Sequence, residues 1–202
     1  MKLYYSRGAC SLGANIVLHE VGASFERIKV DPKTKLTQDG VDFATINPNG
    51  YVPVLELDSG ERLTEAAVIL QYVGDQHPQT GLTPALNTMA HYRLIEWLNF
   101  IASELHKTYS VLFHPEAPED YKAHTRQKLA ERLAHIERQL RSNPYLMGET
   151  FTVADVYLFV VLNWSRVTGV DLTGFPQVQQ YQSRIAKRPA VQAALKSEGL
   201  IK

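Results

Sequence analysis

Short apolar runs alternate with polar turns in the first eighty residues, in the order of a small mixed sheet covered by helices. Residues 2–6 alternate in the manner of a strand, and a helix is expected over 11–21, ended by Gly22. Residues 25–30 read as a second strand. This strand–helix–strand order predicts a parallel pair joined by a right-handed crossover.

The rest of this segment predicts a hairpin followed by a helix. Residues 31–47 are polar and irregular, with room for one short helix. Strands are expected over 54–57 and 62–63, separated by a turn, and Thr64 is expected to cap a helix that runs to Val73. The predicted order over residues 1–80 is strand, helix, strand, helix, strand, strand, helix, which is an α/β domain.

A linker over 77–84, with two prolines and a glycine, separates this domain from a purely helical part. We expect an all-α C-terminal domain over 87–202. Two amphipathic helices carry its apolar stripes, the second of them over about 119–140. Their stripe residues are Leu94, Leu98, Ile101 and Leu105 in the first helix, and Leu129, Leu133, Ile136 and Leu140 in the second.

A capping box marks the helix at the centre of the helical part. Thr152 is the expected cap and Asp155 the third helical residue. The helix that follows is apolar nearly all round, so we expect it to be buried. A last pair of helices is expected after Pro176 and Pro189.

Composition and charge argue against a nucleic-acid-binding protein and against a membrane protein. The 202 residues are 45% hydrophobic and carry 21 basic and 21 acidic side chains, so no long-range field favours nucleic acid. The longest apolar run, 156–162, is too short to cross a bilayer, and the N-terminus has no apolar core of signal-peptide length. A cytoplasmic protein without a nucleic-acid or membrane partner is expected.

Cysteine and histidine usage argues against a metal site. One cysteine cannot form an intrachain disulfide or a cysteine-based zinc site. The seven histidines show no close ligand pairing. We expect no metal.

Cys10 stands at the start of the first predicted helix, where free backbone N–H groups and the helix dipole stabilise a thiolate. Such thiols can fall from a pKa of about 8.5 toward roughly 3.5 to 7.5. Arg7, three residues earlier, adds a positive charge. The alternative is a small buried hydrophobe. Because the chain has no second cysteine, a redox role needs an outside thiol, and glutathione is the obvious cellular one.

Three further features are candidate parts of a functional site, although each has an ordinary structural explanation. Val52-Pro53 is a candidate cis bond, but most X–Pro bonds are trans. Thr64-Glu65-Ala66 begins a helix whose free N–H groups suit a carboxylate, with Glu65 available to an ammonium; a capped helix with an acidic first turn is the alternative. Lys35 lies in a polar loop, where solubility alone can explain it.

A polar set lies in the first long helix. Asn99, Ser103 and His106 recur at i, i+4 and i+7, which predicts that they share one helix face. By themselves, these residues are more ordinarily explained as a solvated polar face.

Together these motifs resemble a bacterial beta-class glutathione transferase of the cysteine type, and the likeness covers essentially the whole chain. It rests on the start Met-Lys-Leu-Tyr-Tyr-Ser-Arg-Gly-Ala-Cys-Ser, on Asn47-Pro48 followed by Val52-Pro53-Val54-Leu55, and on Leu63-Thr64-Glu65. It also rests on 103–107 and 151–155. The resemblance implies a thioredoxin-like N-terminal domain over 1–80 and a C-terminal helical bundle.

The resemblance also implies roles for individual residues. Cys10 would contact the glutathione sulfur, as a hydrogen-bond partner or in a mixed disulfide, and Val52 would pair with the cysteinyl unit. Glu65 and the N–H of Ala66 would hold the γ-glutamyl end, and Lys35 the glycyl carboxylate. His106 would act near the sulfur, and Asn99, Ser103 and Glu104 would complete the site, partly from a neighbouring subunit.

One position departs from the family's pattern, because Ala66 stands where many transferases carry serine. Loss of that hydroxyl predicts weaker glutathione affinity. The implied activity is conjugation or reduction of electrophilic or disulfide substrates by a homodimer, with glutathione as co-substrate and no cofactor. The alternatives are a non-catalytic ligand-binding or interaction protein of the same fold, and a glutathione-dependent dehalogenase or isomerase.

Overall fold

A computed structural model describes all 202 residues. The chain forms two compact units. The first comprises Met1–Thr80 together with Arg188–Lys202, and the second comprises Gly81–Lys187.

The first unit is built on a four-stranded mixed sheet in the order β2-β1-β3-β4. Its strands are β1 (Lys2–Tyr5), β2 (Glu26–Lys29), β3 (Val54–Glu56) and β4 (Arg62–Thr64). β1 and β2 are parallel, whereas β1–β3 and β3–β4 are antiparallel. The predicted parallel pair of β1 and β2 and the predicted hairpin of β3 and β4 are therefore confirmed.

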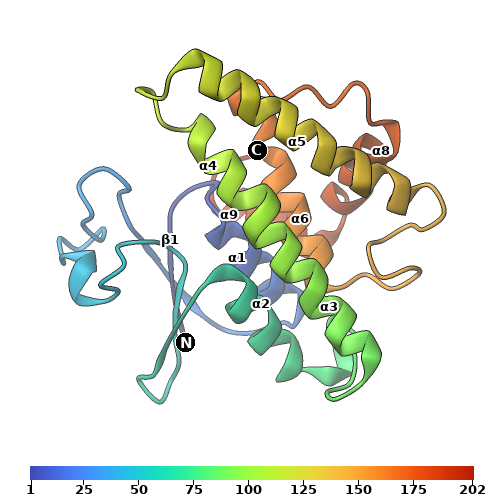
Figure 1. Cartoon of the computed structure of the whole chain (residues 1–202). Helices are drawn as coiled ribbons and strands as arrows, with labels where there is room; N and C mark the ends of the chain where they lie inside the picture. The colour runs from blue at the N-terminus through green and yellow to red at the C-terminus, as the bar shows by residue number, and fades with distance from the viewer. The chain divides into compact units, whose positions relative to one another are not determined.

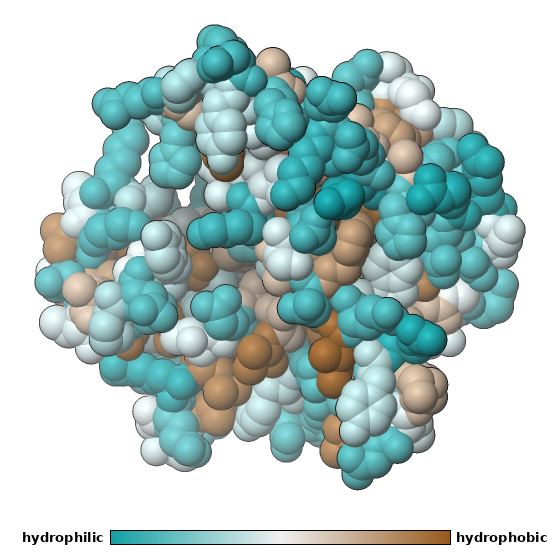
Figure 2. Space-filling model, in the orientation of Figure 1, coloured by the Kyte–Doolittle hydropathy of each residue, from teal (hydrophilic) through white to brown (hydrophobic).

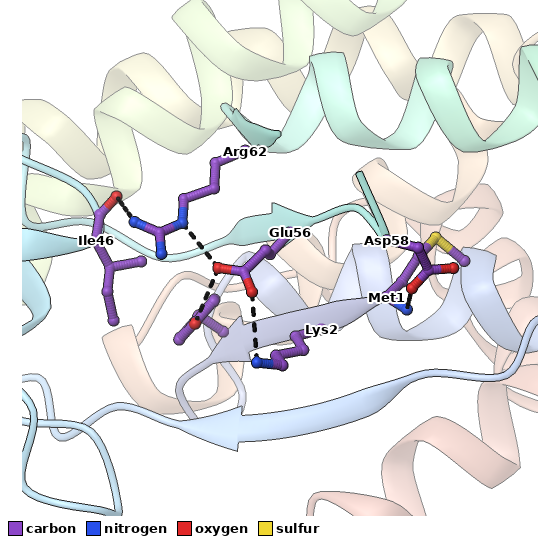
Figure 3. A network of polar contacts seen from close by, with 7 residues as sticks. Met1, Lys2, Ile46, Glu56, Asp58 and Arg62 are labelled. Carbon is purple, nitrogen blue, oxygen red and sulfur yellow. Dashed lines mark hydrogen bonds and ion pairs between the residues drawn. The ribbon is translucent and has the colours of Figure 1, made fainter. Parts of the chain in front are cut away.

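A polar network crosses one end of this sheet (Figure 3). The Glu56 carboxylate on β3 accepts from Arg62 Nε at 2.8 Å and lies 3.4 Å from Lys2 Nζ. The terminal ammonium of Met1 pairs with Asp58 in the turn between β3 and β4. These contacts join three neighbouring strands through their side chains, so they reinforce the register that the backbone sets.

Three α-helices and two 3₁₀ turns complete the first unit. They are α1 (Ser11–Glu20), η1 (Phe43–Thr45), α2 (Ala66–Asp75), η2 (Pro78–Thr80) and α9 (Pro189–Ser197). Both α2 and α9 pack on α1. Gly13 of α1 faces α2, and a Cβ there would lie 3.4 Å from a methyl carbon of Leu70, at the short limit of ordinary van der Waals contact.

The last helix departs from the expected division at 87–202, because α9 belongs to the first compact unit. It buries Val191, Ala194 and Leu195 and lies beside α1 (Figure 1). At its start, two nitrogens of Arg188 bind the Glu20 carboxylate at the end of α1, at 2.7 and 2.9 Å. The sequence shows a helix at this position but does not show the surface on which it packs.

The second unit is entirely helical. Its elements are α3 (Met89–Phe100), η3 (Ile101–His106), α4 (Lys107–Leu112), α5 (Glu119–Leu140), α6 (Val153–Asn163), α7 (Ser165–Thr168) and α8 (Pro176–Ala186). Both predicted leucine-rich stripes are buried, which confirms the two amphipathic helices. None of the helices in the protein has the length and apolar character needed to cross a membrane.

The buried centre of this unit is α6, as predicted, and Asp155 fixes its start. The Asp155 side chain is fully buried and accepts from the N–H groups of Thr152 and Leu146, at 2.8 and 2.9 Å. Tyr181 on α8 donates to the same carboxylate at 3.0 Å. Asp155 therefore caps its own helix and ties a loop and a second helix to it.

Candidate active site

Cys10 immediately precedes α1 and is 8% exposed. Its Sγ donates to the carbonyl oxygen of Val52 at 3.3 Å. Val52 forms a cis peptide bond with Pro53, directly before β3. The fold thus brings together two features that the sequence separates by forty-two positions, the helix start and the proline turn.

The ionisation of Cys10 differs from the expectation of a low-pKa thiolate. Burial raises the pKa of the Cys10 thiol to about 12. The N–H groups of Cys10 and Ser11 act in the opposite direction, as helix-start donors should, but their effect is smaller, and the Glu65 carboxylate raises the pKa further. Cys10 is therefore a thiol and a hydrogen-bond donor in this structure.

Arg7 does not place its positive charge near the Cys10 sulfur, which the sequence led us to expect. Its guanidinium donates to the backbone carbonyl of Gly199, in the turn that follows α9. The positive charge is thus bound to the C-terminal segment instead of being directed at the sulfur.

Glu65 and Ala66 lie at the start of α2, and the helix cap is one residue later than predicted. Thr64 is the last residue of β4, and Glu65 is the cap residue, without a side-chain capping bond. Glu65 has a φ of 65° and ψ of 119°, which a non-glycine residue adopts at a cost of about 1–3 kcal/mol. Its carboxylate is exposed, and the Ala66 side chain is buried. Strain of this kind is concentrated at ligand-binding positions.

Lys35 occupies the loop between β2 and β3, also with a positive φ of 60°. Its Nζ donates to the carbonyl of Gly50 at 3.1 Å and lies 5.6 Å from the centre of the Tyr51 ring. The ammonium is exposed, yet these contacts hold it beside the turn that carries Val52. Cys10, Val52, Glu65 and Lys35 all belong to the first unit.

The remaining predicted residues lie in the second unit, on one continuous helix. Asn99 is exposed near the end of α3, and Ser103 Oγ donates to its carbonyl at 2.9 Å. Glu104 forms an ion pair with Arg132 of α5 at 2.7 Å. Asn99 and Ser103 therefore form the polar surface that the spacing predicts.

His106 does not share that surface, contrary to the i, i+4, i+7 prediction. Residues Ile101–His106 form a π-helix, in which the N–H of Lys107 binds the carbonyl of Ala102, five residues back. The wider turn changes the direction of the side chains that follow it. His106 is therefore half-buried, with its ring edge against Trp164 at 4.8 Å between centroids.

Tyr157 is a partner of His106 that sequence reasoning missed. The Tyr157 hydroxyl lies 2.6 Å from His106 Nδ1. Burial, with a smaller contribution from Lys107, lowers the pKa of His106 to about 4, so the imidazole is neutral at pH 7. A tyrosine within an apolar helix gave no signal in the sequence, because its partner lies fifty-one positions away.

These observations define the class of protein. The first unit has a thioredoxin-like sheet, a cis-proline before β3 and a cysteine at the start of the first helix, and it is followed by an all-α unit. Residues 1–75 match the family model "Glutathione S-transferase, N-terminal domain", and residues 100–189 match "Glutathione S-transferase, C-terminal domain".

Similar proteins agree with these matches over the whole chain. The chain is 42% identical to Glutathione S-transferase GstA of Escherichia coli O157:H7 over 200 residues, which cover 99% of this chain and 100% of that protein. The structure titled "Ternary complex of BphK, a bacterial GST" is 50% identical with a TM-score of 0.97, covering 98% and 100% of the two chains. A sphingomonad glutathione S-transferase complexed with glutathione is 46% identical with a TM-score of 0.96, covering all of both chains. The chain belongs to the glutathione S-transferase family.

Proposed function

We propose that this protein transfers glutathione to small electrophilic substrates, with the glutathione sulfur beside Cys10. The observation that carries the proposal is the Cys10–Val52 contact at the cis-proline turn, with the Glu65 carboxylate near enough to raise the pKa of the thiol. GstA supports the proposal by its name, and the sphingomonad structure by its bound glutathione.

The residues of the first unit have complementary roles in this proposal. Glu65 binds the γ-glutamyl ammonium, the N–H of Ala66 binds the γ-glutamyl carboxylate, and Lys35 binds the glycyl carboxylate. Val52 pairs with the cysteinyl backbone. Asn99, Ser103, Glu104 and His106 are assigned to glutathione from the family resemblance alone.

The high pKa of Cys10 favours conjugation by the thiolate of glutathione over attack by the protein sulfur. When glutathione binds, the Cys10 S–H group turns from the Val52 carbonyl and donates to the glutathione thiolate, and the free N–H groups at the start of α1 donate to the same sulfur. That thiolate attacks the electrophilic carbon, a carbon–sulfur bond forms, and a leaving group such as halide departs with its electron pair. Reduction of a disulfide through Cys10 requires prior removal of the buried thiol proton.

Steady-state turnover of an aryl halide and of a mixed disulfide, each with glutathione, tests the function. The Cys10→Ser variant keeps a hydrogen-bond donor and is expected to retain much of the conjugation, whereas Cys10→Ala loses more of it. Both variants should lose any disulfide reduction that passes through the protein sulfur. Glutathione binding without turnover of either substrate class would contradict the proposal and favour a ligand carrier.

We also propose a homodimer with a two-fold symmetric interface. Four large apolar residues of the second unit are at least 37% exposed and recur every three positions from the loop before α3 onward: Leu86, Met89, Tyr92 and Ile95. Figure 2 shows how hydrophobic side chains reach the surface between larger hydrophilic areas.

A Met89→Glu variant should shift the mass from dimer to monomer in light scattering, and a wild-type monomer at micromolar concentration would contradict the proposal.

A further inference from the structure

The C-terminal turn of the chain, residues 197–200, contacts the turn that precedes Cys10. Glu198 Oε2 accepts the N–H of Gly8 at 2.9 Å, and the carbonyl of Gly199 accepts from the Arg7 guanidinium. A Leu200 methyl carbon lies 3.5 Å from the position that a Cβ on Gly8 would occupy. Three consecutive residues at the end of the chain therefore hold two consecutive residues at its beginning.

Glu198 is the buried residue of this contact. It is 6% exposed, and its second oxygen accepts from Asn15 Nδ2 of α1 at 3.0 Å. Burial raises the pKa of its carboxyl, while hydrogen bonds from Asn15 and Gly8 act in the opposite direction. A carboxylate placed there joins the Gly8 turn to the first helix, and removing it would take away the acceptor that the Gly8 N–H and Asn15 Nδ2 share.

Independent anchors hold the C-terminal segment on the unit. Arg188 binds Glu20 at the start of α9, as described above, and Arg27 of β2 donates to the carbonyl of Ser197 at 2.6 Å. Glu198 therefore acts on the Gly8 turn from a fixed position. The turn itself is tight, because the N–H of Ala9 binds the carbonyl of Ser6 and Gly8 has a φ of 69°.

We infer that Glu198 is a positioning residue for Cys10, which fixes the Gly8 turn so that the thiol stays buried against Val52 at the start of α1. Its importance for turnover rests on the proposed function. Its effect on the exposure of the thiol does not, so the two can be tested separately.

The first measurement is the alkylation rate of Cys10 by iodoacetamide, followed by intact mass in the full-length protein without glutathione. A buried thiol reacts only when its surroundings open, so a looser turn reacts faster. Glu198→Ala is expected to accelerate alkylation about tenfold, the scale of losing one hydrogen bond to a charged group. Glu198→Gln should remain within about twofold, because its amide oxygen can accept from Gly8. Its nitrogen can donate to Asn15 Oδ1 once the Asn15 amide rotates, and this oxygen has no hydrogen-bond partner in the native protein.

Two further variants serve the alkylation measurement, one as a control for general stability and one as a second change at the same contact. Arg188→Ala weakens the other end of α9, so it should lower the stability of the protein while leaving the alkylation rate unchanged. Arg7→Ala changes an exposed side chain and should accelerate alkylation modestly, which provides a reading if Glu198→Ala does not fold. In turnover assays, Glu198→Ala should lower kcat for conjugation more than it raises KM for glutathione.

Two results would overturn the inference. One is alkylation at the wild-type rate in both Glu198→Ala and Arg7→Ala. The other is equal acceleration in Arg188→Ala, which would show a general loss of stability. Neither result depends on glutathione binding, so each leaves the proposed function to its own tests.

Discussion

Two opposing effects determine the pKa of the Cys10 thiol. The start of α1 supplies N–H donors that favour a thiolate, but burial against the proline turn excludes water and favours the protonated form. The second effect is the larger, which the position of the residue in the sequence does not reveal.

We therefore predict slow alkylation of Cys10 in the protein without glutathione. The rate with iodoacetamide should still be rising at pH 10, because the raised pKa leaves little thiolate at neutral pH. Intact mass spectrometry over a pH series measures it. A plateau with a midpoint below pH 7 would restore the low-pKa thiolate that the helix position alone predicts.

His106 gives a second prediction, on stability. Its folded-state pKa of about 4 lies below the ordinary value of about 6.5, so the unfolded chain binds the proton more readily. The contribution of His106 is therefore fully present above pH 6.5 and is lost as the pH falls toward 4. Because His106 is partly exposed, we expect the loss in the free energy of unfolding to be only about 2 kcal/mol.

Denaturant unfolding at several pH values tests whether stability falls with pH in this direction. The free energy of unfolding of His106→Gln should decline less than that of the wild type between pH 6.5 and 4. Comparing the two proteins removes the contribution of the other titrating groups. Parallel curves for both proteins would show that His106 does not resist protonation.

At the scale of elements, apolar periodicity was sufficient for most of the fold. The helix expected over 119–140 has those bounds, and the strand order of the first unit follows from the pattern of short apolar runs. The π-helix Ile101–His106 could not be predicted, because its buried residues Ile101 and Leu105 are spaced four apart, as an α-helix also requires. The cis peptide before β3 and the strained backbone of Glu65 likewise depend on tertiary contacts.

The capping of α6 by Asp155 was predicted from the sequence and is confirmed. Replacing Asp155 with alanine leaves the N–H groups of Thr152 and Leu146 and the Tyr181 hydroxyl without this acceptor. We expect Asp155→Ala to lower the free energy of unfolding by about 3 kcal/mol or more, since each buried unpaired group costs roughly 1–3 kcal/mol. Chemical denaturation measures the loss, and a change below about 1 kcal/mol would show that the cap is dispensable.

At the scale of the whole molecule, both ends of the chain contribute to the first unit. The N-terminal strand forms the centre of the sheet, and the last helix packs on α1. Such a unit cannot be delimited by reading the sequence in order, because residues 188–202 follow the entire helical unit. The glutathione contacts proposed for this unit come from its loops and from the starts of its helices α1 and α2.

Calorimetric titration of glutathione into the whole protein is the most direct test of the proposed glutathione site. We expect one glutathione site per chain, with Glu65→Ala weakening binding by about 1–3 kcal/mol because the ammonium loses its charged partner. Glu61→Ala, which removes an exposed carboxylate from the neighbouring turn, should bind as the wild type does. Unchanged affinity in Glu65→Ala, or an equal loss in Glu61→Ala, would contradict the site.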